Sequence, residues 1–254
     1  MNLEKLLKSF DELKLKTIAT EAEIYLKQQI PSKQQEMILV MMKWIEAEKA
    51  HRYASLVNSR VKSAKFEEMK TVDVFDFNYN ASTKKAEKTF LSIHNNITKT
   101  SLPRVIFYGD TGLGKTHLAK ALGFASCQQG LTVLFTTAAK IVNDLEAANK
   151  LHTIEIEINK YKRPQVLIID EFGYVNFSAQ ASNLFFQLLS ARHAKKLGLI
   201  ATTNLAFSEF GKIFAYEAVA RVIVDRIVSA AEVFTFEGKS YRLHERELAK
   251  SRKQ

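Results

Sequence analysis

The segment Gly109–Thr116 combines the residue types and the spacing needed to hold a phosphate group. It reads Gly-Asp-Thr-Gly-Leu-Gly-Lys-Thr and fits the pattern G-x-x-x-x-G-K-[ST]. Glycines let the backbone curl until successive N–H groups point inward at phosphate oxygens, and a helix predicted over residues 115–127 would direct its positive end at the same anion. The predicted nucleotide-binding residues of this segment are Gly109, Asp110, Thr111, Gly112, Leu113, Gly114, Lys115 and Thr116.

Two side chains of this loop have distinct tasks in a nucleoside triphosphate site. The Lys115 ammonium can reach the β- and γ-phosphates, and the Thr116 hydroxyl can ligate Mg²⁺. The apolar run Val105–Tyr108 precedes the loop, and a strand before the loop with a helix after it is the context in which this pattern binds phosphate. A nucleoside triphosphate with Mg²⁺ is therefore the expected ligand.

Two carboxylates directly follow the apolar run Val166–Ile169. Asp170, at the end of a predicted strand, is placed to hold Mg²⁺, usually through water. Glu171 is the candidate base that polarises the attacking water. The spacing from Lys115 leaves room for one further strand with its helices, which favours a metal and base pair over an ordinary acidic turn.

A third polar group ends the run Ile200-Ala201-Thr202-Thr203-Asn204. In a parallel sheet the ligand crevice lies at the carboxyl ends of the strands. We therefore expect Asn204 or Thr202 to orient the water near the γ-phosphate.

The elements that must position these side chains can be predicted from the alternation of short β-rich runs with longer amphipathic stretches. Such alternation is typical of an α/β fold, in which helices cover both faces of a parallel sheet. The five predicted strands are Val105–Tyr108, Val133–Thr136, Val166–Ile169, Leu199–Thr202 and Val233–Phe236.

The first 108 residues contain no glycine, which favours helices. An apolar stripe with steps of three and four residues predicts helical structure that ends by Pro31, and Ser32 with Gln35 resembles a capping box that opens a second helix. The alternating segment Thr71–Phe77 suits an extended connector, and a helix is predicted over roughly residues 81–98. We therefore predict a small all-helical domain over residues 1–70 and a nucleoside triphosphate-binding domain over 71–254.

The second predicted helix has a mixed face. Its first half is apolar, whereas cations and a tyrosine enter the same wedge in the second half. One interpretation is a core helix whose far end twists into solvent, with the cations extended along it. The other is a basic and aromatic surface for DNA, whose candidate residues are Lys49, Arg52, Tyr53 and Arg60.

Composition excludes several classes of protein. The 254 residues carry a net charge of +10, which favours a polyanionic partner. No apolar run approaches the roughly 20 residues that cross a bilayer, and charges interrupt the hydrophobic start, so neither a membrane span nor a signal peptide is expected. A single cysteine, Cys127, excludes an intrachain disulfide framework. A cytoplasmic protein that does not bind membranes is expected.

Taken together, the motifs resemble the AAA+ ATPases, and more closely the bacterial IstB-like ATPases of insertion sequences, which are relatives of the DnaC helicase loader. The resemblance covers nearly the whole chain. It rests on Gly-Lys-Thr-His-Leu-Ala at 114–119, Asp-Glu-Phe-Gly-Tyr at 170–174, Thr-Thr-Asn at 202–204, Asp225-Arg226 and Ser240-Tyr241-Arg242. It implies ATP and Mg²⁺ as cofactors, and it adds His117 and Arg242 to the expected nucleotide-binding residues.

The resemblance also implies an assembly. Arg226 matches the arginine with which one subunit completes its neighbour's site, although it could instead pair with Asp225. Arg242 matches a second phosphate sensor or a tail anchor. The loop departs from the family at Asp110, Thr111 and Leu113, where Pro-Pro and a small or β-branched residue are common. Only 16 residues follow Gly238, so the helical lid of many AAA+ proteins is not expected, and closure would come from a neighbouring subunit.

Three functions are consistent with these motifs. The resemblance implies an ATPase that forms ADP and phosphate, assembles on double-stranded DNA as an ATP-dependent oligomer, and assists and regulates a transposase. The alternative is a DnaC-like loader of a replicative helicase, since both would use the same ATPase core. A scaffold that binds ATP with little hydrolysis is a third possibility, against which the presence of Glu171 argues.

Overall fold

The computed structural model describes residues 2–229 and 231–244. The chain divides into two compact units, Met1–Asn58 and Ser59–Gln254. We call the first the helical unit and the second the sheet unit, and each is described by itself.

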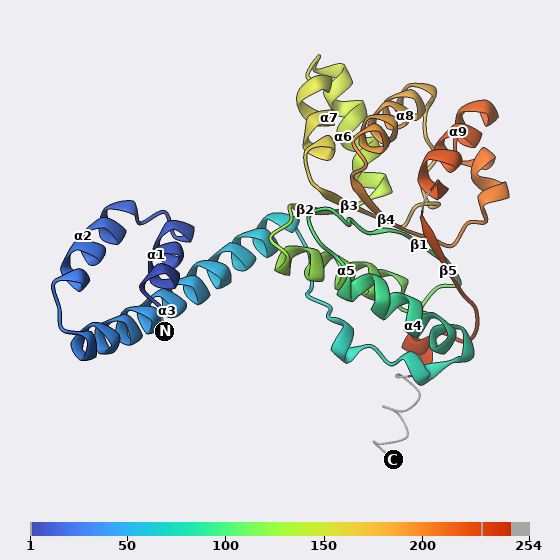
Figure 1. The fold of residues 1–254 in the computed structure, drawn as a ribbon. Coiled ribbons are helices and arrows are strands. Elements are labelled where there is room, and N and C mark those ends of the chain that lie inside the picture. Colours follow the sequence, from blue (N-terminus) through green and yellow to red (C-terminus); the bar gives the residue numbers. More distant parts are fainter. Residues whose placement is uncertain (1, 230, 245–254) are drawn as a thin grey trace. The chain divides into compact units, whose positions relative to one another are not determined.

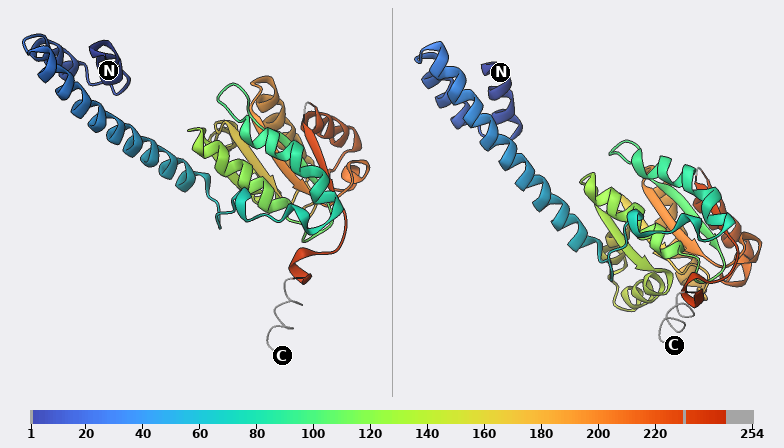
Figure 2. Two further views of the ribbon diagram at one scale, coloured as in Figure 1. Left: turned by 60° about the horizontal axis from the view of Figure 1, so that its bottom comes forward. Right: turned by 90° about the horizontal axis from the view of Figure 1, so that it is seen from below.

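The helical unit contains α1 (Leu3–Glu12), α2 (Lys16–Lys27) and the first part of α3 (Pro31–Ala64). Figure 2 shows α1 and α2 beside the N-terminal half of α3. The apolar stripes of the three helices meet in one core, where Leu6 and Leu26 are fully buried and Ile38 and Ile45 are nearly so. The predicted helical structure of this part of the chain is confirmed.

The helical region predicted before Pro31 consists of two helices, because the chain turns at Lys14, which has a φ of 60°. The predicted capping box at Ser32 is wrong, because α3 already begins at Pro31, and the Gln34 N–H donates to the Ile30 carbonyl at 2.9 Å. Proline is well suited to the first helical position, since its missing N–H has no partner there in any case.

The units divide after residue 58, inside α3, which is one continuous helix. From the sequence we predicted the domain boundary at residue 70. The end of α3 packs within the sheet unit: Ala64 is fully buried, and the Arg60 Nε donates to the Gly130 carbonyl at 3.1 Å. Although α3 has 34 residues, among the described residues no helix is both long and apolar enough to cross a membrane.

The connector after α3 is not extended as predicted. It contains two short 3-10 turns, η1 (Val72–Val74) and η2 (Phe77–Tyr79), with Phe75 between them. The Phe75 and Phe77 rings pack edge to face, with their centroids 4.7 Å apart. Both side chains belong to the hydrophobic core on one face of the sheet. The alternation of polar and apolar residues therefore arises because this segment runs over a hydrophobic core and buries its aromatic side chains there, and the segment is not a strand of the sheet.

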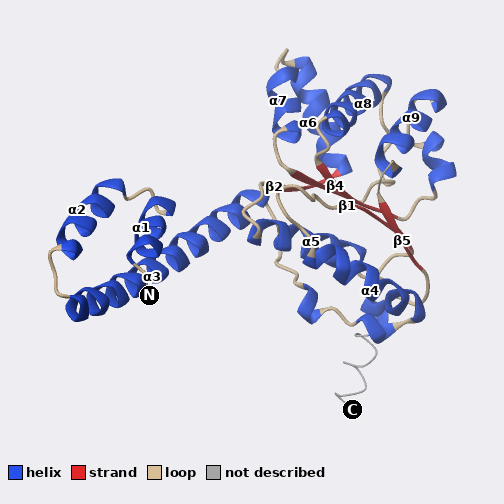
Figure 3. Ribbon diagram, viewed as in Figure 1, coloured by secondary structure: helices blue, strands red, loops and turns tan. Residues whose placement is uncertain are grey.

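A parallel five-stranded sheet forms the centre of the sheet unit, and all five predicted strands are confirmed. The strands lie in the order β2-β3-β4-β1-β5 (Figures 1 and 3). Their bounds are β1 (Arg104–Gly109), β2 (Val133–Thr137), β3 (Val166–Asp170), β4 (Gly198–Thr203) and β5 (Glu232–Phe236).

Helices cover both faces of this sheet, as Figure 1 shows. One face packs on α4 (Ala81–Asn95) and α5 (Lys115–Gln128). The other packs on α6 (Ala138–Lys150), α7 (Ile154–Lys162), α8 (Ala179–Ala194), α9 (Glu217–Val228) and the 3-10 helix η3 (Phe207–Lys212).

Alternate residues along each strand serve the two cores. In β1, Val105 and Phe107 enter the core beside α5, whereas Ile106 enters the other core. Cys127 on α5 is fully buried in the first of these cores, where burial raises the pKa of its thiol to about 12. The runs predicted as strands are mostly apolar because helices cover both faces of the sheet.

Arg192 on α8 connects the outer helices to the sheet. Its side chain is 2% exposed. The guanidinium donates to the carbonyls of Tyr161 and Pro164 at 2.8 Å each and to that of Gly198 at 2.6 Å. It thereby satisfies backbone acceptors where α7 ends and where β3 and β4 begin, and a planar fork of donors suits this task better than an ammonium would.

We predict that Arg192→Met and Arg192→Lys each lower the free energy of unfolding of the sheet unit by about 3 kcal/mol, because buried carbonyls lose their donor. Urea unfolding followed by circular dichroism measures the loss. Arg221→Met, which removes an exposed pair with Glu217, is the control and should leave the midpoint unchanged. An Arg192→Met protein as stable as the wild type would contradict this role.

Candidate nucleotide-binding site

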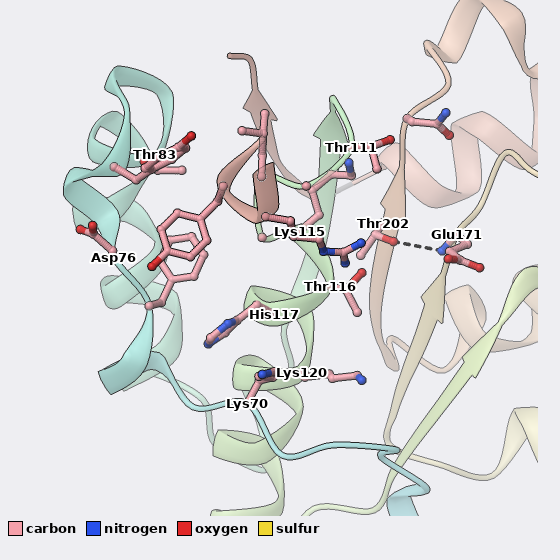
Figure 4. Close-up of a pocket in the computed structure, with 18 of the residues that line it drawn as sticks. Lys70, Asp76, Thr83, Thr111, Lys115, Thr116, His117, Lys120, Glu171 and Thr202 are labelled. Atoms are coloured by element: carbon pink, nitrogen blue, oxygen red, sulfur yellow. Dashed lines mark hydrogen bonds between the residues drawn. The ribbon is translucent and has the colours of Figure 1, made fainter. Parts of the chain in front are cut away.

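The carboxyl ends of three neighbouring strands meet at one edge of the sheet and line a cavity of about 480 Å³. The glycine loop follows β1, Asp170 and Glu171 lie at the end of β3, and the Thr202–Asn204 segment ends β4. Figure 4 shows Thr111, Lys115, Thr116, Glu171 and Thr202 gathered around this cavity. Residues predicted from three separate motifs thus lie in one pocket.

The glycine loop leads directly into α5. Gly114 is the residue before the helix and has a φ of 84°, a left-handed conformation that glycine adopts without a steric penalty. No side chain caps this helix terminus. Its first N–H groups therefore point into the pocket with the positive end of the helix dipole, which suits a phosphate group.

Lys115 is placed as the motif predicts. Its Nζ donates to the carbonyls of Gly109 and Asp110, at 2.7 Å each, so the side chain curls back over the loop. Burial lowers the pKa of Lys115, whereas Asp110 and Asp170 raise it and Arg242 lowers it. An anion in the pocket would offset both the burial of this ammonium and its repulsion by Arg242.

The residues predicted to hold Mg²⁺ are in contact. The Thr116 hydroxyl donates to the Asp170 Oδ1 at 2.9 Å, and Asp170 is only 6% exposed. A hydroxyl and a carboxylate beside a phosphate-binding loop are oxygen ligands of the kind that Mg²⁺ prefers. Because this pair lies beside the glycine loop, these residues fit a nucleotide with Mg²⁺.

Glu171 and Asn204 are both exposed and both line the pocket. Glu171 has a φ of 56°, which turns the chain sharply at the end of β3. Its backbone N–H donates to the Thr202 hydroxyl at 3.0 Å, the bond drawn in Figure 4. Two solvent-facing polar side chains are therefore available beside the phosphate end of the pocket.

An aromatic end of the pocket was not predicted as part of the site. Phe75, Asp76, Tyr79 and Thr83 line it from the connector and α4, and Figure 4 shows Asp76 and Thr83 on the side away from Glu171. The Tyr79 ring meets Tyr241 edge to face at 4.8 Å. Flat apolar surfaces of this kind suit a nucleobase. The Phe75-Asp76-Phe77 triplet could have indicated this part of the pocket, but from the sequence we assigned it only to the connector.

The segment after β5 closes back on the glycine loop. The Tyr241 N–H donates to the Gly112 carbonyl at 3.0 Å. A Cβ atom on Gly112 would lie 2.1 Å from the Ser240 Oγ, so the segment packs directly on the glycine. Arg242 lines the pocket and is exposed. Tyr241 thus anchors the segment to the glycine loop. The Arg242 side chain lines the same pocket as Lys115.

His117 lines the pocket but is bound elsewhere. Its Nε2 donates to the Thr71 carbonyl at 2.7 Å, and its ring meets Phe75 edge to face at 5.2 Å. Burial lowers the pKa of His117, while the bond to Thr71 raises it. These contacts make His117 a link between α5 and the connector at the wall of the pocket.

Arg226 on α9 is not among the residues that line the pocket of its own chain. Its Nε is buried without a hydrogen-bond partner, and within residues 2–229 and 231–244 it forms no ion pair with Asp225 or any other acid. The surface pair with Asp225 that was the alternative is therefore not formed.

The four candidate DNA-binding residues all lie on α3. Lys49 pairs with Glu12 at 2.8 Å, and Arg52 donates to the Leu13 carbonyl at 2.9 Å and pairs with Glu48. Both cations thus hold α1 against α3. Arg60 binds within the sheet unit, as described above, and Tyr53 is 55% exposed.

We predict that Gly112→Ala loosens the Tyr241–Gly112 contact and weakens ATP binding by about tenfold or more, since a left-handed alanine costs roughly 1–2 kcal/mol and its Cβ displaces Ser240. Hydrogen exchange at the Tyr241 amide should accelerate, and titration with a fluorescent ATP analogue should show the lost affinity. Gly211→Ala in η3 is the matched control, because this glycine has no positive φ and an added Cβ would make only an ordinary contact with the Glu217 side chain at 3.4 Å. Unchanged exchange at Tyr241 would show that the contact does not depend on Gly112.

Comparison with solved structures shows the fold. The DnaC helicase loader superposes with a TM-score of 0.58 at 19% identity, over 66% of this chain and 96% of that one. Together with the strand order and the glycine loop, this likeness identifies the sheet unit as an AAA+ P-loop fold.

Comparison of sequences shows the family. The model of the family described as IstB-like ATP binding protein matches residues 8–249. The chain is 31% identical to the insertion sequence IS5376 putative ATP-binding protein of Geobacillus stearothermophilus, over 82% of each chain. It is also 31% identical to the insertion sequence IS21 putative ATP-binding protein of Pseudomonas aeruginosa, over 78% of this chain and 74% of the relative. Because these matches span most of its length, the chain belongs to the IstB-like family of insertion-sequence ATP-binding proteins.

Proposed function

We propose that this protein is a Mg²⁺-dependent ATPase that assembles on double-stranded DNA and thereby assists and regulates a transposase. The observation that carries the proposal is that Lys115, Thr116 and Glu171 line one pocket of a family member, with the Asp170 carboxylate bound to the Thr116 hydroxyl. A pocket that only binds ATP would have no use for an exposed carboxylate beside the oxygen ligands for Mg²⁺.

The reaction is the transfer of the γ-phosphoryl group of ATP to water, which forms ADP and phosphate. The N–H groups of Asp110–Lys115 and the Lys115 ammonium hold the β- and γ-phosphates. Bound Mg²⁺, held by Thr116 and Asp170, would neutralise charge on those phosphates. Glu171 accepts the proton of the attacking water, Asn204 orients that water, and Arg242 contacts the phosphates from the opposite side.

The position of Arg226 supports an assembly. Because Arg226 is not among the residues that line the pocket of its own chain, we assign its guanidinium to a nucleotide bound by a neighbouring subunit. There its guanidinium would stabilise the charge that develops on the γ-phosphate. An arginine supplied from outside the chain makes hydrolysis depend on the oligomer, which is the physical basis of an ATP-dependent assembly.

DNA is the polyanionic partner that the net charge of +10 favours. We assign contacts with DNA or a protein partner to residues 1–70 and hydrolysis to residues 71–254. Lys49 and Arg52 are candidate DNA contacts even though they are paired, because side chains in surface ion pairs exchange readily for a phosphate. Tyr53 and Arg60 are the other candidates.

A helicase loader is the second candidate, and the likeness of the sheet unit to the DnaC helicase loader favours it. Pull-down with a replicative helicase of the host distinguishes the two functions. Binding to the helicase, without binding to a transposase encoded beside this gene, would favour the loader.

We predict that Glu171→Gln still binds ATP but hydrolyses it at least about 100-fold more slowly, because the base is lost, and that it accumulates in the assembled state. Lys115→Ala should not bind ATP. Fluorescent nucleotide titration, phosphate release and sedimentation velocity measure these three effects. Glu155→Gln on α7, an exposed acid outside the pocket, is the control. If Glu171→Gln hydrolyses ATP at the wild-type rate, Glu171 is not the base.

We predict that ATP increases affinity for a 30-base-pair duplex and that this affinity falls steeply with salt, because phosphate contacts release counterions. Filter binding at about 50 and 200 mM salt, with and without ATP, measures both effects. Lys115→Ala should show the low affinity under all conditions. Equal DNA affinity with and without ATP, in protein that binds the nucleotide, would contradict ATP-dependent assembly on DNA.

A further inference from the structure

Thr202 occupies a special position at the end of β4. Its side chain is 2% exposed, and it contacts three consecutive residues of the neighbouring chain segment. The hydroxyl donates to the Asp170 Oδ1 and accepts the Glu171 N–H at 3.0 Å. The Thr202 carbonyl accepts the Phe172 N–H at 2.8 Å. Thr202 thus binds the carboxylate of Asp170, the proposed metal ligand, and the backbone N–H groups of Glu171, the proposed base, and of the residue after it.

The pairing between β3 and β4 ends just before these contacts. The last pair that the two strands form with each other is Ile169 and Ala201, although β3 still pairs with β2 at Asp170 and β4 with β1 at Thr203. Beyond them the chain turns at Glu171, where φ is 56°, a left-handed conformation that a side chain with a Cβ atom rarely adopts. Such a backbone persists only where its surroundings hold it. Here Thr202 provides two of the holding contacts, and the Tyr174 N–H adds a long bond to the Glu171 carbonyl at 3.5 Å.

The left-handed turn decides where the Glu171 carboxylate points. In a continued strand, successive side chains alternate between the two faces of the sheet, and both faces are covered by helices. The turn instead leaves the Glu171 side chain exposed in the pocket. The direction of the base therefore depends on the contacts that stabilise this backbone.

The Asp170 carboxylate is set by the same hydroxyl. Its Oδ1 accepts from Thr202 on one side and from Thr116 on the other. These two bonds fix the rotation of the carboxylate, so that its orientation is established before any ligand enters. A residue that orients both Asp170 and Glu171 couples the metal ligand to the base.

We propose that Thr202 is a positioning residue for ATP hydrolysis, which acts by holding the Glu171 backbone and the Asp170 carboxylate. This rests on the proposed function, in which Glu171 is the base. The role needs a hydroxyl, because one atom must accept the Glu171 N–H and at the same time donate to Asp170. Valine has the same shape but can do neither.

The alternative is that Thr202 is an ordinary buried strand residue, for which valine would substitute with little effect on the reaction. Thr136 on β2 offers a matched comparison. It is also buried, at 6% exposed, and also lies near the end of a strand, but it does not line the pocket. Thr136→Val therefore controls for the loss of a buried hydroxyl from this sheet.

The test compares steady-state hydrolysis and nucleotide binding for Thr202→Val, Thr202→Ser and Thr136→Val. We expect Thr202→Val to lower kcat about 10- to 100-fold, as loss of a group that orients a ligand typically does, with KM for ATP changed less than about threefold. Thr202→Ser should retain kcat within about threefold, and Thr136→Val should match the wild type. A Thr202→Val protein with unchanged kcat, or a Thr202→Ser protein as slow as Glu171→Gln, would overturn the proposal.

A double-mutant cycle separates this proposal from the one on which it rests. If Thr202 acts through Glu171, Thr202→Val should lower the residual rate of Glu171→Gln by less than about threefold, because the base is already absent. A further drop as large as in the wild-type background would refute positioning through Glu171. Wild-type hydrolysis by Glu171→Gln alone would instead refute the assignment of the base. If Thr202→Val does not fold, as judged by its thermal transition, Thr202→Ala, which also lacks the hydroxyl, replaces it in the same comparison with the same expected loss of kcat.

Discussion

Positive charge and backbone N–H groups are concentrated at the carboxyl edge of the sheet, and the phosphate-binding arrangement depends on this concentration. The start of α5, the Lys115 ammonium and the exposed Arg242 all face the same pocket. Burial already disfavours the charged Lys115, and the approach of Arg242 adds to this. A polyphosphate relieves both costs, so the pocket gains most from the ligand that carries the most negative charge.

The surrounding elements hold this edge from three directions. Strands β1, β3 and β4 end side by side, which brings the loop, the two acids and the polar Thr202–Asn204 segment together. The connector packs Phe75 against the loop helix, and the segment after β5 binds Gly112. The site is therefore assembled from segments that are far apart in the sequence but meet at one end of a rigid sheet.

The local features of this arrangement could be predicted from the sequence, whereas the contacts between distant segments could not. Five strands and the glycine loop were found because a covered strand is mostly apolar and because the loop has a fixed spacing. The bond between Tyr241 and Gly112 joins segments that no local pattern relates. The same is true of the pairing of Lys49 with Glu12, since periodicity places Lys49 on a face of the helix but does not say what lies opposite. Thr202 was considered only for orienting water, because a backbone turn at Glu171 leaves no trace in residue types.

The burial of Cys127 has a practical consequence. It is the chain's one cysteine, it is fully covered by the core beside α5, and its high pKa keeps it in the unreactive thiol form. Maleimide reagents should therefore not label the folded protein. A cysteine introduced at any exposed position would accept a fluorophore or spin label selectively, with no need to replace the native sulfur first.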